Sequence, residues 1–209
     1  MKDWFSKKVV FILFLQSFSI LIEQFIIMIQ NRIVSIPQTI LKFFCFFTIL
    51  TNILVALSFS FYFFEPKKTF SFFTKPNFQT AVAVYIFIVA FVYNIILRFL
   101  WNPKGLQQIV GEFLHLIIPL IYLLFWYFKV DKSVMPWNSF LKWMLYPLLY
   151  LLVILFLGSL TNYYPYPFIN ITVLGKTTLY RNIFILTLFF GLISLIFIGI
   201  SKIQYMSKI

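Results

Sequence analysis

The residues of this chain that could carry chemistry lie inside long apolar stretches. His115, the only histidine, follows Glu112 by three residues, so the two share one face of a helix and can meet. An ionisable side chain at membrane depth is costly to hold there, which makes each one a candidate for function. A histidine beside a carboxylate can accept, donate or relay a proton. This pair is therefore the first candidate for acid–base chemistry.

The composition indicates that the surroundings of this pair are a membrane. Of the 209 residues, 62% are hydrophobic, 22% are aromatic and only 11% are charged, and the mean hydropathy is +0.97. A soluble domain is about half apolar and about a quarter charged. We therefore predict an all-α, polytopic membrane bundle.

A membrane-spanning helix needs about 20 mostly apolar residues. The sequence predicts six such spans, at residues 9–29, 40–64, 81–101, 108–128, 140–160 and 182–201. The segments between them carry Pro, Asn and Gly, which favour turns. No repeat, low-complexity linker or shift in composition marks a soluble domain. The prediction is a single six-helix transmembrane domain over residues 1–209.

Six spans place both termini on the same side of the membrane. That side would carry most of the 17 Lys and Arg residues, namely Lys2, Lys7, Lys8, Lys67, Lys68, Lys75, Lys129, Lys132, Lys142, Lys202 and Lys208. An excess of basic residues in loops marks the cytoplasmic side. We therefore expect both termini in the cytoplasm and the loops after spans one, three and five on the outer side.

The outward half of this topology holds several polar residues of spans two, three and four. They are Thr48, Asn52, Asn94, Arg98, Glu112 and His115. At 1.5 Å per residue, Thr48 lies about 12 Å and His115 about 10 Å from the outer starts of their helices, so their depths are comparable. Arg98 ends the third span and could reach Glu112 to form an ion pair. We expect a polar site that faces the outer side.

Several function classes are excluded by the residues available. The net charge of +12 comes from residues scattered between apolar runs, which fits topology-setting loops and contacts with anionic lipid, so we expect no nucleic-acid partner. One histidine cannot ligate a haem from both faces. His115 and Glu112 alone are too few ligands for zinc, and Cys45 has no second cysteine to pair with. We therefore expect no metal and no cofactor.

Five short motifs, in this order, resemble those of the FAR/AIG-type (androgen-induced) integral membrane proteins, in particular a bacterial six-pass branch. The resemblance covers about residues 40 to 180. The motifs are Phe47-Thr48-Ile49-Leu50-Thr51-Asn52-Ile53-Leu54-Val55-Ala56, Arg98-x-x-Trp101-x-Pro103-x-Gly105, Leu114-His115-x-x-x-Pro119, Tyr146-Pro147-x-x-Tyr150 and Tyr164-Pro165-Tyr166-Pro167-Phe168.

This resemblance implies a membrane-embedded threonine hydrolase. Animal members of the family cleave fatty acid esters of hydroxy fatty acids with one Thr and one His, which match Thr48 and His115 here. The spacing from His115 to Pro119 is one residue shorter than in the animal proteins, and the Tyr-Pro-Tyr-Pro-Phe segment is fuller than their Tyr-Pro-Phe. The implied partners are membrane lipids or an acyl-lipid substrate, and the implied location is a bacterial plasma membrane.

Under this hypothesis Thr48 attacks the ester carbonyl and His115 takes its proton. Glu112 could orient the imidazole, as the acid of a catalytic triad does. Arg98 or Asn52 could donate to the developing oxyanion. The outer loop could cap the cavity through Tyr164, Tyr166, Pro167 and Phe168.

Other interpretations of the same residues remain open. Thr51 is as well placed as Thr48 to be the nucleophile, and a membrane threonine most often bonds the carbonyl four residues back. In a non-enzymatic lipid-binding, transport or assembly protein, Arg98, Glu112 and His115 would form a structural polar network that fixes helix packing. Proton-coupled transport through Glu112 and His115 is a third alternative.

Overall fold

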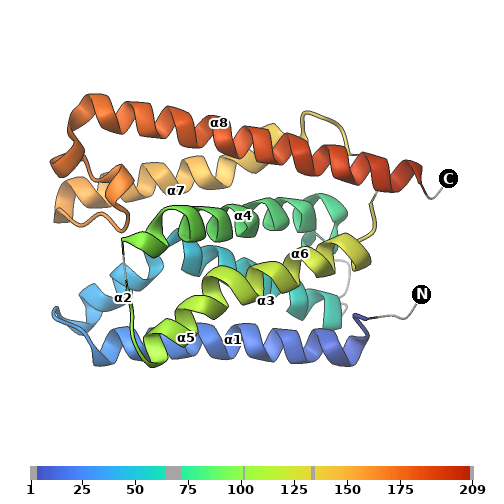
Figure 1. The fold of residues 1–209 in the computed structure, drawn as a ribbon, viewed down its shortest axis with the longest axis horizontal. Helices are drawn as coiled ribbons and strands as arrows, with labels where there is room; N and C mark the ends of the chain where they lie inside the picture. The colour runs from blue at the N-terminus through green and yellow to red at the C-terminus, as the bar shows by residue number, and fades with distance from the viewer. Residues whose placement is uncertain (1–3, 65–71, 101, 133–134, 208–209) are drawn as a thin grey trace. The chain divides into compact units, whose positions relative to one another are not determined.

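The computed structural model describes residues 4–64, 72–100, 102–132 and 135–207. Five residues used in the predictions above, Lys2, Lys67, Lys68, Trp101 and Lys208, lie outside these ranges. Within them every regular element is helical, and six helices are long and apolar enough to cross a membrane (Figure 1). The predicted all-α membrane fold with six spans is confirmed.

The chain divides into two compact units, residues 1–131 and residues 132–209. The prediction of one domain over the whole chain stays a prediction. The first unit contains α1 (Lys7–Gln30), α2 (Ile36–Phe44), α3 (Phe47–Phe64), α4 (Pro76–Ile95), the 3-10 turn η2 (Leu97–Phe99), α5 (Leu106–Glu112), the π-helical turn η3 (Phe113–Ile117) and α6 (Ile118–Lys129).

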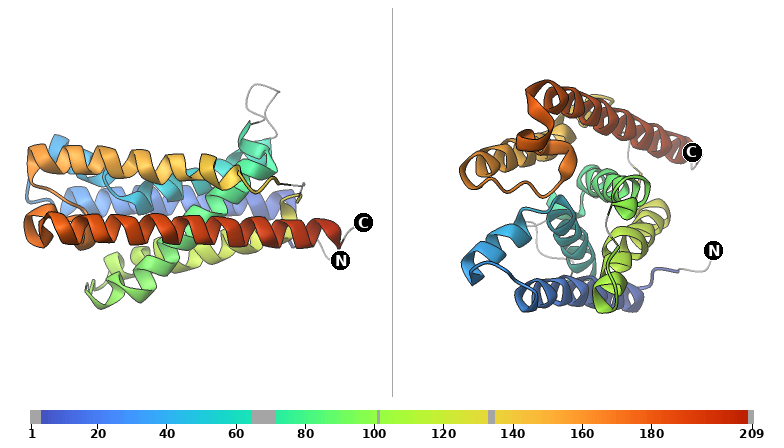
Figure 2. Two further views of the ribbon diagram at one scale, coloured as in Figure 1. Left: turned by 90° about the horizontal axis from the view of Figure 1, so that it is seen from above. Right: turned by 60° about the vertical axis from the view of Figure 1, so that its left-hand side comes forward.

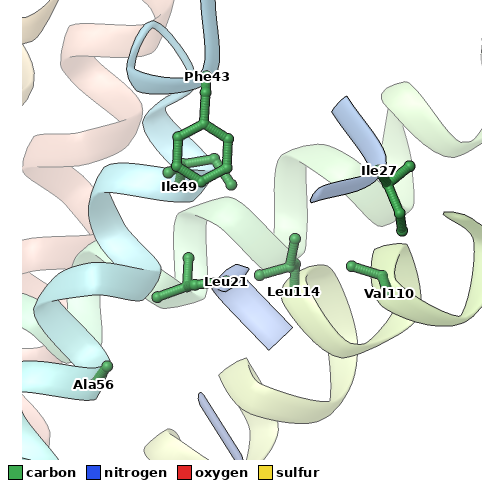
Figure 3. Packing of buried hydrophobic residues seen from close by; sticks show 7 residues of the cluster. All are labelled: Leu21, Ile27, Phe43, Ile49, Ala56, Val110 and Leu114. Atoms are coloured by element: carbon green, nitrogen blue, oxygen red, sulfur yellow. The ribbon is translucent and has the colours of Figure 1, made fainter. Parts of the chain in front are cut away.

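The first unit is held together by helix packing around an apolar core. Helix α1 packs on α3, α3 packs on α4, and α4 packs on α6. Figure 3 shows one cluster of this core, made of Leu21, Ile27, Phe43, Ile49, Ala56, Val110 and Leu114. Because lipid tails are as apolar as these side chains, close packing and hydrogen bonds between helices stabilise such a core more than exclusion of water does.

The second predicted span, 40–64, is wrong at its start. A separate short helix, α2, ends at Phe44, and α3 begins at Phe47 (Figure 1). Helix α2 begins where the Ser35 N–H donates to Gln38 Oε1 at 3.2 Å, and it buries Thr39 and Phe43. Its other face is exposed and apolar, with Ile36, Ile40, Leu41 and Phe44. With nine residues α2 is too short to cross a membrane, and its exposed apolar face suits contact with lipid.

The third and fourth predicted spans are shifted by only a few residues. Helix α4 begins at Pro76, five residues before the predicted start, because Pro is favoured in the first helical turn. The fourth span runs from Leu106 to Lys129, but it is not one regular α-helix. Its middle turn, η3, has the wider π-helical hydrogen-bond spacing. This interruption contains His115.

The second unit is a pair of long helices, α7 (Ser139–Thr161) and α8 (Ile171–Met206), which lie side by side (Figure 2). The connection between them contains the 3-10 turn η4 (Pro167–Ile169). The sixth predicted span, 182–201, lies within α8, which begins eleven residues earlier, at Ile171, and ends five residues later, at Met206. A kink at Gly175, whose φ of 71° favours glycine, separates the first turn of α8 from the rest.

Candidate functional site

The candidate site is built around two adjacent backbone carbonyls that lack the usual α-helical donor four residues further along the fourth span. Within η3 the Ile118 N–H donates to Phe113 O, five residues back, so it does not serve Leu114 O, four residues back. The residue four positions after His115 is Pro119, which has no N–H to donate to His115 O. In a membrane an unsatisfied carbonyl is costly, so both oxygens require donors from elsewhere.

Two asparagine side chains supply these donors. Asn52 Nδ2, on α3, donates to Leu114 O at 3.1 Å, and Asn94 Nδ2, on α4, donates to His115 O at 3.2 Å. Each amide also donates to the carbonyl four residues back in its own helix, at 2.9 Å to Thr48 O and 2.8 Å to Ala90 O. Each amide therefore ties its helix to η3.

The His115 ring is fixed on one side by its own helix and on the other by α4. Its Nδ1 lies 2.8 Å from Gly111 O, and its ring stacks on Tyr93 with centroids 3.8 Å apart and an angle of 12°. A carbonyl oxygen only accepts, so Nδ1 carries the hydrogen. In the neutral imidazole the lone pair is then on Nε2, which makes no hydrogen bond with the described residues. A ring held this way can act as a base through Nε2.

Arg98 and Glu112 form the ion pair that the sequence suggested. Arg98 Nη2 donates to Glu112 Oε2 at 2.6 Å, and the guanidinium carbon lies 5.5 Å from the centroid of the Tyr93 ring. The side chains are 39% and 31% exposed, so the pair lies at the edge of the site rather than in its interior. Tyr93 thus lies between this pair and His115.

Two predicted supporting roles change with this geometry. Glu112 bonds Arg98, and Gly111 O holds Nδ1 of His115, so the backbone carbonyl replaces Glu112 as the group that orients the imidazole. The two amide hydrogens of Asn52 are both used on backbone carbonyls, so Asn52 cannot donate to an oxyanion without losing one of these bonds.

Both candidate nucleophiles are buried in α3. Thr48 is 7% exposed and Thr51 is fully buried. The Asn52 amide joins Thr48 O to Leu114 O, which places the Thr48 turn of α3 against η3. The choice between Thr48 and Thr51 as the nucleophile stays open, as it was from the sequence alone.

The loop predicted to cap the site packs within the second unit. Tyr164 lies so close to α7 that a Cβ added to Gly158 would be 2.2 Å from its ring. Tyr166 stacks on Phe168, with centroids 5.2 Å apart, and Pro167 begins η4. The capping of the first unit by this loop stays a prediction.

A second polar cluster was missed by the sequence analysis. Tyr122 Oη donates to Gln79 Oε1 at 2.7 Å, and Trp126 Nε1 donates to Thr80 Oγ1 at 2.9 Å. These bonds tie α6 to the beginning of α4. Gln79 and Thr80 stand immediately before the predicted span 81–101, so the sequence analysis placed them outside the membrane helix. Because these donors and acceptors are paired with one another, we assign this cluster to helix packing.

The described residues contain no group of three or more His, Cys, Asp or Glu side chains that could hold a metal ion. No family model, curated protein or solved structure matches the chain. The resemblance to the androgen-induced family therefore remains an expectation from its motifs. The chain is a helical, multi-pass membrane protein whose polar residues on α3, α4 and the fourth span meet at η3.

Proposed function

We propose that this protein is a membrane-embedded hydrolase of lipid carboxylic esters, with Thr48 as nucleophile and His115 as general base. The observation that carries the proposal is the fixed tautomer of His115: Nδ1 donates to Gly111 O at 2.8 Å, which leaves the lone pair on Nε2. Catalytic histidines need this arrangement, with one nitrogen held by an acceptor and the other free to take a proton. The π-helical turn adds support, since such turns are frequent at functional sites.

The reaction would run in two stages. Thr48 Oγ1 attacks the ester carbonyl carbon while Nε2 of His115 takes the hydroxyl proton. The tetrahedral intermediate then expels the alcohol, which takes the proton from Nε2 and leaves an acyl group on Thr48. In the second stage a water molecule attacks the acyl carbonyl, and Nε2 takes a proton from that water. The bond from the acyl carbon to Thr48 Oγ1 then breaks, and Oγ1 takes the proton from Nε2 to become a hydroxyl again. The products are a carboxylic acid and the regenerated enzyme.

The substrate class follows from the surroundings of the site. The helices that carry Thr48 and His115 are predominantly apolar, and the core beside them is aliphatic and aromatic. Such walls suit acyl chains. Fatty acid esters of hydroxy fatty acids, which the animal members of the resembling family cleave, are one class of substrate of this kind. The half-exposed Arg98–Glu112 pair marks the polar end of the site, where a carboxylate or headgroup would lie.

A second candidate function is supported by the asparagine contacts. Asn52 and Asn94 together join three elements of the first unit through backbone carbonyls, which is what a structural polar network requires. In that case the protein is a non-enzymatic lipid-binding, transport or assembly protein, and His115 serves packing through its stack on Tyr93.

One set of variants separates the two functions. A fluorophosphonate probe and a long-chain p-nitrophenyl ester are applied to the purified full-length protein in nanodiscs. His115→Asn is the sharpest variant, because an Asn amide can replace Nδ1 as donor to Gly111 O but has no counterpart of Nε2. The hydrolase proposal expects loss of labelling and ester cleavage in His115→Asn and Thr48→Ala, with normal folding by size-exclusion chromatography.

Thr51→Ala is the matched control for the nucleophile. Loss of activity in Thr51→Ala with retention in Thr48→Ala would transfer the role to Thr51. A wild-type protein that neither labels nor cleaves esters, or activity retained in His115→Asn, would favour the structural network instead.

A further inference from the structure

The carboxamide oxygen of Asn52 lacks a hydrogen-bond donor in the interior of the protein. Asn52 is fully buried, and its Oδ1 is one of two buried side-chain polar atoms of the described residues without a hydrogen-bond partner. The other, Gln204 Oε1, lies near the end of α8. Leaving a buried acceptor unpaired is unfavourable, so such an atom calls for a partner or an explanation.

The orientation of the Asn52 amide is fixed by its neighbours. Nδ2 faces two carbonyl oxygens, Thr48 O at 2.9 Å and Leu114 O at 3.1 Å, and both can only accept. Turning the amide over would place Oδ1 against these two oxygens and lose both bonds. The unpaired atom is therefore the oxygen, and it is directed away from both carbonyls.

We propose that Asn52 Oδ1 is the acceptor of a buried subsite that binds one neutral O–H donor, either a water molecule or an alcohol hydroxyl. A cationic donor is disfavoured, because a charge buried beside a single neutral acceptor would lose far more solvation than one hydrogen bond returns. A water molecule or a hydroxyl is the smallest neutral donor that could satisfy this oxygen.

The subsite lies beside the candidate catalytic residues. Asn52 bonds the carbonyl of Leu114, the residue that precedes His115, and it lies one helical turn after Thr48. The existence of the subsite does not depend on the hydrolase proposal. The role of the subsite in catalysis does rest on the hydrolase proposal. Besides the Thr48 hydroxyl, the O–H donors of that reaction include the attacking water and the released alcohol. Oδ1 would bind one of them.

Asn94 provides a matched comparison within the same site. Its amide makes the same pair of bonds, to the carbonyl four residues back and to a carbonyl of η3. Its side chain is only half-buried, however, and its oxygen is not among the buried unpaired atoms. Asn52→Leu and Asn94→Leu therefore each remove one tie to η3, but only Asn52→Leu removes the buried acceptor.

The first test is a structure of the full-length protein in nanodiscs at a resolution that shows ordered water. We expect density at about 2.7–3.2 Å from Asn52 Oδ1. An isolated peak identifies water, and a peak continuous with an alkyl chain identifies a lipid alcohol. We expect the peak to vanish in Asn52→Leu and to remain in Asn94→Leu. A well-resolved map with no density at Oδ1 would overturn the proposal.

The second test measures how the acyl group is shared between water and added 1-octanol during ester cleavage. Loss of one hydrogen bond to the attacking O–H corresponds to about a tenfold change in rate. We expect Asn52→Leu to change the ratio of acid to octyl ester by about this factor, and Asn94→Leu to leave the ratio unchanged. Equal ratios in all three proteins would show that Oδ1 does not distinguish water from the alcohol, and would overturn its assignment to one of the two. Wild-type protein without ester cleavage would instead refute the hydrolase, and the density at Oδ1 would still decide the subsite.

Discussion

Pro119 and Asn94 should be energetically coupled, because Pro119 removes a hydrogen-bond donor to His115 O and Asn94 supplies one. Pro119 removes the usual α-helical donor to His115 O, and Asn94 Nδ2 donates to that oxygen at 3.2 Å. In Pro119→Ala the restored N–H can donate to His115 O. Asn94→Leu should therefore be costly when Pro119 is present and much less so when it is replaced.

The expected size of this coupling follows from the interactions lost. Hydrogen bonds between membrane helices average about 0.6 kcal/mol and reach about 1.7 kcal/mol. Leaving a buried acceptor unpaired costs about 1–3 kcal/mol. Pro119 also removes this donor to His115 O when the helix is unfolded from its neighbours. The net cost of Asn94→Leu is therefore smaller than the full cost of an unpaired acceptor. We expect Asn94→Leu to cost about 1–2 kcal/mol in the wild-type background and less than about 0.5 kcal/mol with Pro119→Ala.

The assay is equilibrium unfolding in mixed detergent micelles of the wild type, the two single variants and the double variant. The coupling energy is the difference between the cost of the double change and the sum of the single costs. A value near 1 kcal/mol supports the reasoning. Additive costs, within about 0.3 kcal/mol, would show that Asn94 does not act as a substitute for the missing N–H.

Three further predictions concern other parts of the chain. Arg98→Gln and Glu112→Gln should each lower the free energy of unfolding by at most about 1 kcal/mol in the same assay, because the pair is partly exposed; a loss of several kcal/mol would mean that it is buried in the membrane. Gly158→Ala should lower that free energy by about 1–3 kcal/mol, because the new Cβ would lie 2.2 Å from the Tyr164 ring, and Tyr164→Ala should restore most of the loss. In Ile33→Trp the indole, on a side chain 95% exposed just before α2, should be quenched by brominated lipids in proteoliposomes, whereas a lack of quenching would place α2 away from the bilayer.

The sequence was sufficient for the elements that depend on composition. The first, fourth and fifth spans were predicted to within about two residues at each end, because apolar runs of about 20 residues have few alternatives in a membrane. The early end of α2 at Phe44 could not be predicted, since residues 40–64 form one continuous apolar run. Whether such a run crosses the membrane or turns along its surface depends on packing that composition does not record.

The polar residues that the sequence grouped are in contact in the structure, but their hydrogen-bond partners were only partly predicted, and their role as a functional site stays a prediction. Depth along the helices was enough to group Asn52, Asn94, Arg98, Glu112 and His115, and charge was enough to pair Arg98 with Glu112. The partner of the His115 ring, the backbone carbonyl of Gly111, was not predictable. Every residue has such a carbonyl, so the residue types do not indicate which one the ring contacts. The π-helical turn was equally hidden, since it depends on which carbonyls the neighbouring helices can satisfy.

The break in the fourth span explains why the polar residues of the site occur together. Pro119 and the π-helical turn deprive two adjacent carbonyls of their usual α-helical donors, and asparagines on α3 and α4 bond these carbonyls. These bonds hold Thr48 and Tyr93, on the same helices, around the turn that carries His115. A purely structural role accounts for the bonded nitrogens of both asparagines, but it gives no use to Nε2 of His115 or to Oδ1 of Asn52. These two atoms are the ones through which a substrate or a water molecule would be bound, and the variants that remove them are therefore the ones that decide the function.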